Sequence, residues 1–140
     1  MMEMSKREEL VKRALEARLK AYSPYSDFCV GAALLCEDGE IYEGANVENS
    51  SYGATNCAER TALFTAVYDG KRRFDAIAIV GAMRGCEVDS YCPPCGICRQ
   101  ALAEFMSADA EILLFDGKNI KVTTMAGMLP EMFDKASLER

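Results

Sequence analysis

Two cysteine motifs constrain the fold of this chain more than any other feature. Cys57 opens the segment Cys-Ala-Glu-Arg, and Cys95 and Cys98 follow later in the segment Pro-Cys-Gly-Ile-Cys. Each motif lies at the start of a predicted helix, where the helix dipole favours thiolates. The chain has no histidine, so we expect a catalytic metal to be held by the thiolates of these cysteines. A fold that brings the two helix starts together would give one metal ion three thiolate ligands.

Three thiolates suit Zn²⁺, and a three-ligand site leaves the fourth tetrahedral position open to water, which is typical of catalytic zinc. The site would carry a net negative charge, which weakens zinc as a Lewis acid unless nearby groups withdraw electron density. The two helix ends and the guanidinium of Arg60 would do so. We therefore predict one Zn²⁺ per chain, held by Cys57, Cys95 and Cys98, with Arg60 donating to the sulfurs.

The same residues allow other interpretations, which the sequence alone leaves open. Cys92 forms a second Cys-x-x-Cys pair with Cys95, so a closed four-thiolate structural site is an alternative. Cys95 and Cys98 would also suit a redox dithiol. Glu59 is either a proton shuttle or the return half of a capping box with Asn56. The two arginines of the motifs, Arg60 and Arg99, would otherwise be surface charges.

Composition narrows the class of protein. A length of 140 residues suits a single domain, residues 1–140, and no repeat or low-complexity segment divides it. A net charge of −6 argues against nucleic acid as a partner. The longest apolar stretch, 76–83, is far shorter than the roughly 18 residues of a membrane span. The amino terminus lacks signal-peptide features and the seven cysteines are odd in number, so we expect a cytoplasmic protein with reduced thiols.

Hydrophobic periodicity and turn residues predict the order α-β-β-α-β-α-β-β with a short helical tail. Ser5 and Glu8 suggest a capping box for the first helix, and Ser23-Pro24 would end it. The predicted helices span 5–22, 57–68 and 95–106, and the predicted strands span 30–36, 40–43, 76–81, 111–115 and 119–123. The continuously apolar run 76–81 suits a strand covered on both faces. The chain is therefore expected to be an α/β protein with a sheet flanked by helices.

Beyond the cysteine motifs, four segments resemble the small, homotetrameric cytidine deaminases of the cytidine/deoxycytidylate deaminase superfamily. These segments are 22–26, 28–33, Asn46-Val47-Glu48-Asn49, and Leu129-Pro130 with Phe133. The resemblance runs almost end to end. It implies a three-layer α/β/α cytidine deaminase-like fold with a mixed central sheet of about five strands. Pro93, where the family usually has a small polar residue, and Cys92 before it depart from the pattern.

The resemblance also implies a reaction, the zinc-dependent hydrolysis of cytidine and deoxycytidine to uridine and deoxyuridine plus ammonia in pyrimidine nucleoside salvage. Zinc hydroxide would attack C4 of the pyrimidine while Glu59 carries the proton to N3 and later to the departing amine. The backbone N–H of Ala58 would lie near the zinc-bound water or the base carbonyl. The carbonyl of Pro93 would receive the leaving amine.

Further family roles fall on matching positions. Asn46 and Glu48 would bind the ribose 3′-hydroxyl, and Phe28 and Phe133 would pack against the pyrimidine ring. Without the resemblance, these would be ordinary turn and core residues. Tyr52 lies in a loop that in this family reaches the site of an adjacent subunit. The resemblance thus implies a homotetramer with shared sites and a nucleoside as the small-molecule substrate.

The fixed negative charge of Glu48 near the sugar should disfavour phosphate, so nucleosides are predicted over CMP, dCMP and polynucleotides. A deaminase of the blasticidin S type would share the zinc motifs, but its loop lacks the Asn-x-Glu-Asn form of residues 46–49. A zinc-stabilised interaction module without catalysis is an alternative from another class. A polynucleotide-editing deaminase fits poorly because the chain is acidic and lacks a basic groove.

Overall fold

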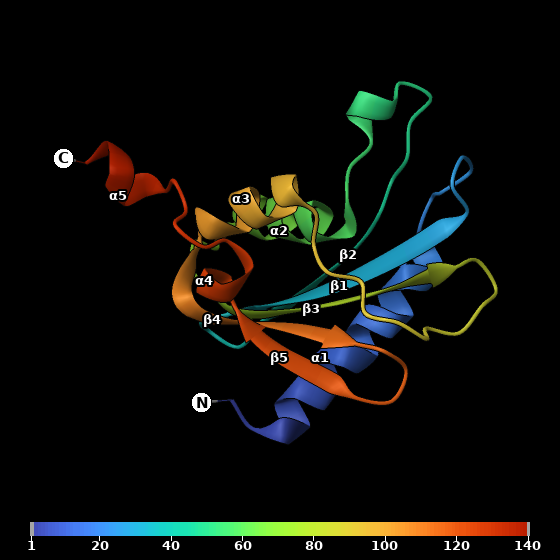
Figure 1. The fold of residues 1–140 in the computed structure, drawn as a ribbon, viewed down its shortest axis with the longest axis horizontal. Helices are drawn as coiled ribbons and strands as arrows, with labels where there is room; N and C mark the ends of the chain where they lie inside the picture. Colours follow the sequence, from blue (N-terminus) through green and yellow to red (C-terminus); the bar gives the residue numbers. More distant parts are fainter. Residues whose placement is uncertain (1, 140) are drawn as a thin grey trace.

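The computed structural model describes residues 2–139, which form a five-stranded mixed sheet between layers of helices (Figure 1). The strands are β1 (Phe28–Cys36), β2 (Ile41–Ala45), β3 (Phe74–Met83), β4 (Met106–Phe115) and β5 (Ile120–Thr124). The helices are α1 (Met4–Ala17), α2 (Ala58–Tyr68), α3 (Gly96–Ala103), α4 (Met125–Met128) and α5 (Lys135–Leu138). Short 3₁₀ turns span Arg18–Lys20 and Tyr52–Ala54. None of the helices within residues 2–139 is long and apolar enough to cross a membrane.

The strands lie in the order β2-β1-β3-β4-β5. β3 and β4 are parallel and are connected through α3, whereas all other neighbouring strands are antiparallel. Seven consecutive residues of β3, from Ala76 to Ala82, are all buried, so this strand is covered on both of its faces. The prediction of a strand covered on both faces is therefore confirmed.

Alternate residues of a strand point to opposite faces of the sheet. Each face therefore carries its own apolar core, and helices cover both. On one face, Leu10 and Ala14 of α1 pack with Ala33 and Leu35 of β1. The opposite face carries α2, α3 and α4 over a second core, whose largest fully buried residues include Leu34, Leu63, Ile77, Leu102 and Met125. Figure 1 shows α1 on one side of the sheet and α2 and α3 on the other. The predicted α/β architecture, with five strands in a mixed sheet, is confirmed.

The ends of two predicted helices differ from the structure. The prediction of a capping box formed by Ser5 and Glu8 is wrong. The helix α1 already begins at Met4, and its N-cap, Glu3, makes no side-chain capping bond. That helix also ends at Ala17, and a 3₁₀ turn continues to Lys20. α3 ends at Ala103 rather than at residue 106, because the chain enters β4 at Met106.

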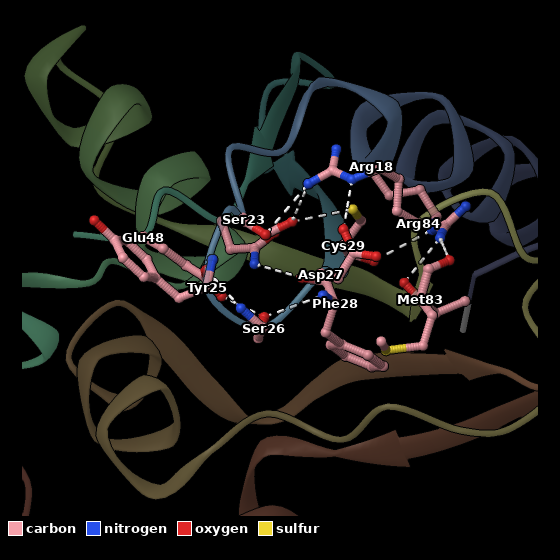
Figure 2. Close-up of polar contacts among 12 residues, drawn as sticks. Arg18, Ser23, Tyr25, Ser26, Asp27, Phe28, Cys29, Glu48, Met83 and Arg84 are labelled. Carbon is pink, nitrogen blue, oxygen red and sulfur yellow. Dashed lines mark hydrogen bonds and ion pairs between the residues drawn. The ribbon is translucent and has the colours of Figure 1, made fainter. Parts of the chain in front are cut away.

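Arg18 fixes the end of the sheet where β1 begins and β3 finishes. Phe28, the first residue of β1, pairs with Met83, the last residue of β3. The buried guanidinium of Arg18 donates to the carbonyl oxygens of Cys29 at 3.2 Å, Ala82 at 2.9 Å and Met83 at 3.1 Å (Figure 2). Buried carbonyl groups need such donors. Arg18 therefore holds the two strand ends together beside the segment that precedes Phe28.

Candidate metal centre

The three predicted ligands lie together where two helices begin. Cys57 is the N-cap of α2 and Cys95 is the N-cap of α3, and both have extended backbones. Their sulfur atoms are 3.8 Å apart. Cys98, in the first turn of α3, is fully buried, and the three sulfur atoms all lie within 4.8 Å of one another. Both helix N-termini therefore direct their partial positive charge at one cluster of thiols.

This donor set fits zinc. Tetrahedral zinc with Zn–S bonds of about 2.3 Å places its sulfur ligands roughly 3.8 Å apart, which agrees with the Cys57–Cys95 separation. Over residues 2–139, no fourth ligand belongs to the group of Cys57, Cys95 and Cys98. The sulfur of Cys92 instead lies against Gly81. The geometry thus gives a three-thiol site and provides no closed four-thiol arrangement among the described residues.

Arg60 contacts the cluster directly. Its Nη2 donates to the sulfur of Cys57 at 3.4 Å. The Nε of Arg60 is buried and has no hydrogen-bond partner among residues 2–139. The pKa of Cys57 is lowered, first by a hydrogen bond from the Cys98 thiol and then by the Arg60 guanidinium. Arg60 therefore lies against the sulfur of Cys57, with its Nε buried.

Glu59 lies in the first turn of α2 and is only 4 % exposed. Burial raises the pKa of its carboxyl to about 7, and the charge of the neighbouring Cys57 adds to the effect. The alternative capping box with Asn56 is absent, since Cys57 is the N-cap and makes no side-chain capping bond. The amide Nδ2 of Asn56 instead donates to the hydroxyl of Thr61 at 3.0 Å. The carboxyl of Glu59 is thus left beside the thiols.

Phe28 and Cys92 form a wall at Gly81, in which Cys92 lies close enough to Glu59 to be affected by its charge. Gly81 in β3 leaves room for both, because a Cβ atom there would lie 2.9 Å from the sulfur of Cys92 and 2.9 Å from Cε2 of Phe28. Burial raises the pKa of Cys92 to about 11, with a further contribution from the charge of Glu59. The sequence analysis did not identify Gly81. The signal that could have identified it is a glycine inside a buried strand, which often marks a place where another group approaches the backbone closely.

Asn46 follows β2 directly and is buried. Its Nδ2 donates to the carbonyl oxygen of Phe28 at 2.9 Å, and its Oδ1 accepts from the backbone N–H of Val30, also at 2.9 Å. Both ends of the amide therefore bind the start of β1. In this chain Asn46 holds the backbone on either side of Cys29, and so it sets the position of Phe28.

Glu48 binds the turn that precedes β1. Its Oε1 accepts from the backbone N–H groups of Tyr25 at 2.9 Å and Ser26 at 3.1 Å, and its Oε2 accepts from the Ser26 hydroxyl (Figure 2). These donors, Ser26 above all, lower the pKa of Glu48 and keep the carboxylate charged. Glu48 also lines a cavity of about 350 Å³ together with Tyr25, Ser26, Tyr52 and Thr55.

Backbone groups predicted to contact the base flank the cluster. Ala58 is the buried first residue of α2, so its N–H belongs to the helix N-terminus and has no intrahelical acceptor. Pro93 lies in the exposed loop before α3. Arg99 ties this loop to α4, because its Nε donates to the carbonyl of Pro94 and its Nη1 to that of Met128, both at 2.7 Å. Arg99 thus fixes the loop that carries the second cysteine motif.

Two predicted residues are exposed on the single chain. Tyr52, which is 74 % exposed, packs edge to face on Tyr25 with ring centroids 5.8 Å apart. Its loop stands away from the sheet (Figure 1). Phe133 is 58 % exposed, although its carbonyl accepts from Nε2 of Gln100 at 2.8 Å. One chain therefore does not bury these two aromatic rings.

Comparisons with known proteins agree with this geometry. The model of the cytidine and deoxycytidylate deaminase zinc-binding region matches residues 4–113. A cytidine deaminase of Sporosarcina psychrophila is 49% identical over 132 residues, which cover 94% of this chain and 93% of the relative. A cytidine deaminase of Halalkalibacterium halodurans is 48% identical over 91% of this chain and 93% of its own length. A more distant blasticidin-S deaminase of Bacillus cereus is 32% identical over 87% of this chain and 88% of its own length.

Solved structures extend the comparison to the fold. The 1.6 Å crystal structure of cytidine deaminase from Burkholderia pseudomallei matches with a TM-score of 0.82 at 44% sequence identity. The match covers 94% of this chain and 100% of that chain. The similarity therefore extends over nearly the whole of both proteins.

Proposed function

This chain belongs to the cytidine and deoxycytidylate deaminase family, and we propose that it deaminates free pyrimidine nucleosides in nucleoside salvage. Zinc-dependent hydrolytic deamination of cytidine is the function supported by its relatives and its thiol cluster. The observation that carries the proposal is the meeting of three thiols at two helix starts, with the buried Glu59 beside them. A non-catalytic zinc module would not need this carboxyl, and the similarity to a blasticidin-S deaminase is weaker.

The side chains around the cluster have separate roles in the proposed reaction. Bound zinc supplies a Lewis acid that lowers the pKa of a coordinated water. Glu59 takes one proton from the attacking water and delivers it to N3 of the base, and it then takes the second proton from the new hydroxyl on C4 and delivers it to the departing amine. Arg60 stabilises the thiolate of Cys57. The net reaction consumes cytidine and water and yields uridine and ammonia.

We propose that the base lies between the thiol cluster and the wall formed by Phe28 and Cys92. The N–H of Ala58 has no intrahelical acceptor and is free to bind the base carbonyl or the attacking water. The carbonyl of Pro93 would receive the amine, and Phe133 would cover the ring from the carboxy-terminal segment. Asn46 would act on the sugar and also through its hold on the start of β1.

Glu48 is proposed to bind the 3′-hydroxyl of the sugar from the cavity that it lines. Because hydrogen bonds keep this carboxylate charged, a substrate phosphate would meet a negative charge. We expect kcat/KM for cytidine and deoxycytidine to exceed that for CMP and dCMP by roughly a hundredfold. Loss of ultraviolet absorbance on deamination measures all four substrates in parallel. Comparable turnover of dCMP would contradict the preference.

We further propose that residues 1–140 form a single domain that assembles into a homotetramer with shared sites. The exposed loop that carries Tyr52, and the exposed Phe64 and Tyr68 on α2, are suited to contacts with a second copy. Light scattering is expected to give four times the 15.4 kDa mass of the chain, and a monomer that is fully active would contradict shared sites.

A cytoplasmic location is proposed because thiolate ligands require a reducing compartment.

A further inference from the structure

The hydroxyl of Ser26 contacts two residues with different proposed roles. It accepts the backbone N–H of Phe28 at 3.0 Å and donates to Oε2 of Glu48 (Figure 2). The direction of both bonds is fixed by chemistry, because a backbone N–H can only donate and an ionised carboxylate can only accept. One hydroxyl therefore connects the carboxylate proposed to bind the sugar with the residue proposed to contact the base.

Both carboxylate oxygens of Glu48 accept hydrogen bonds from the turn at residues 25–26. Oε1 accepts the backbone N–H groups of Tyr25 and Ser26, whereas Oε2 accepts from the hydroxyl of Ser26. A carboxylate oxygen has a second lone-pair site. A sugar hydroxyl that reached Glu48 from the cavity would therefore share Oε2 with Ser26, whose charge-assisted bond fixes the orientation of that oxygen.

The turn itself is held by other contacts as well. Asp27, between Ser26 and Phe28, has a φ of 63°, which is unusual for a residue with a side chain. Arg84 makes two hydrogen bonds to Asp27. Its Nε donates to Oδ1 of Asp27 at 2.7 Å, and its backbone N–H donates to the carbonyl oxygen of Asp27 at 2.7 Å. The exposed hydroxyl of Ser26 is thus not needed to close the turn, and its removal should leave the fold intact.

We propose that Ser26 is a positioning residue that couples Glu48 to Phe28, so that the sugar side and the base side of the site are set together. This inference rests on the proposed function, in which Glu48 binds the 3′-hydroxyl. It assigns Ser26 no contact with the reacting atoms. Its effect is largest on the binding of nucleosides that carry a 3′-hydroxyl.

Steady-state kinetics of Ser26→Ala with cytidine and with 3′-deoxycytidine test the inference. We expect KM for cytidine to rise about tenfold, because a charge-assisted hydrogen bond that orients Glu48 is lost. The rise for 3′-deoxycytidine should be clearly smaller, since that nucleoside has no hydroxyl for Glu48 to bind. Ser26→Thr, which keeps a hydroxyl, should restore the wild-type KM.

Ser107→Ala is the matched control. Ser107 is also exposed and donates its hydroxyl to a carboxylate, that of Asp109 at 2.7 Å. It lies near the opposite end of the sheet, where Phe74 pairs with Met106. This variant should leave both KM values unchanged. In a Glu48→Gln background, Ser26→Ala should no longer change the preference for cytidine over 3′-deoxycytidine.

Two results would overturn the inference. One is an equal rise of KM for both nucleosides in Ser26→Ala, and the other is a failure of Ser26→Thr to restore binding. A thermal melt shows whether each variant is folded before its kinetics are compared. A wild-type protein that did not deaminate cytidine would contradict the proposed function itself, and that outcome needs no substitution to be seen.

Discussion

Glu59→Gln is expected to lower kcat for cytidine by about a thousandfold while the protein keeps its fold and its zinc. Glutamine has nearly the same size and fits the same buried position in the first turn of α2. Its amide cannot accept the two protons of the attacking water in turn and pass one to the base and the other to the amine. Turnover is followed by the loss of ultraviolet absorbance, and zinc per chain is measured on the same sample.

The control for this variant is Glu16→Gln, which removes a carboxylate from α1 on the other face of the sheet. Its activity should equal that of the wild type. Full activity of Glu59→Gln would remove this residue from the mechanism. Loss of zinc from Glu59→Gln would instead give the carboxyl a structural role at the cluster.

Cys98→Ala is expected to lose its zinc and, with it, measurable turnover. Cys98 is fully buried, and its sulfur is one of the three that lie within 4.8 Å of one another. Removing a ligand should weaken zinc binding by more than about a hundredfold, since even residues that only support metal ligands contribute 10–100-fold. The thermal midpoint should also fall, because metal binding stabilises the folded state. Zinc content by elemental analysis checks the first effect.

Cys92→Ser is the matched control, because Cys92 belongs to the second Cys-x-x-Cys pair of the sequence. Its sulfur lies at Gly81 beside the ring of Phe28 rather than in the thiol cluster. The variant should therefore keep one zinc per chain, although the changed wall can alter KM. Loss of zinc from Cys92→Ser would support the closed four-thiolate site.

Local sequence signals predicted much of the fold. The helix predicted over 57–68 agrees with α2, because Cys57 takes the N-cap position and the chain turns at Gly70, whose φ is 94°. The apolar run 76–81 lies within β3, where a strand is covered on both faces. The three ligands were predicted from cysteine spacing at two helix starts. These features depend on neighbouring residues and are therefore visible in a sequence.

Other features depend on contacts between distant segments and had no local signal. Arg18 binds carbonyl groups of β1 and β3, and its burial cannot be inferred from its position on an amphipathic helix. The bond from Ser26 to Glu48 joins two loops that meet only once β1 and β2 have paired. The predicted capping box of Ser5 and Glu8 rested on a local pattern alone, and α1 begins earlier, at Met4, with Glu3 as its N-cap.

Zinc K-edge X-ray absorption on the catalytically active protein is the most direct test of the metal centre. The account predicts one zinc per chain with three sulfur neighbours at about 2.3 Å and one lighter oxygen or nitrogen neighbour. Four sulfur neighbours, or cytidine turnover by protein that contains no zinc, would contradict it.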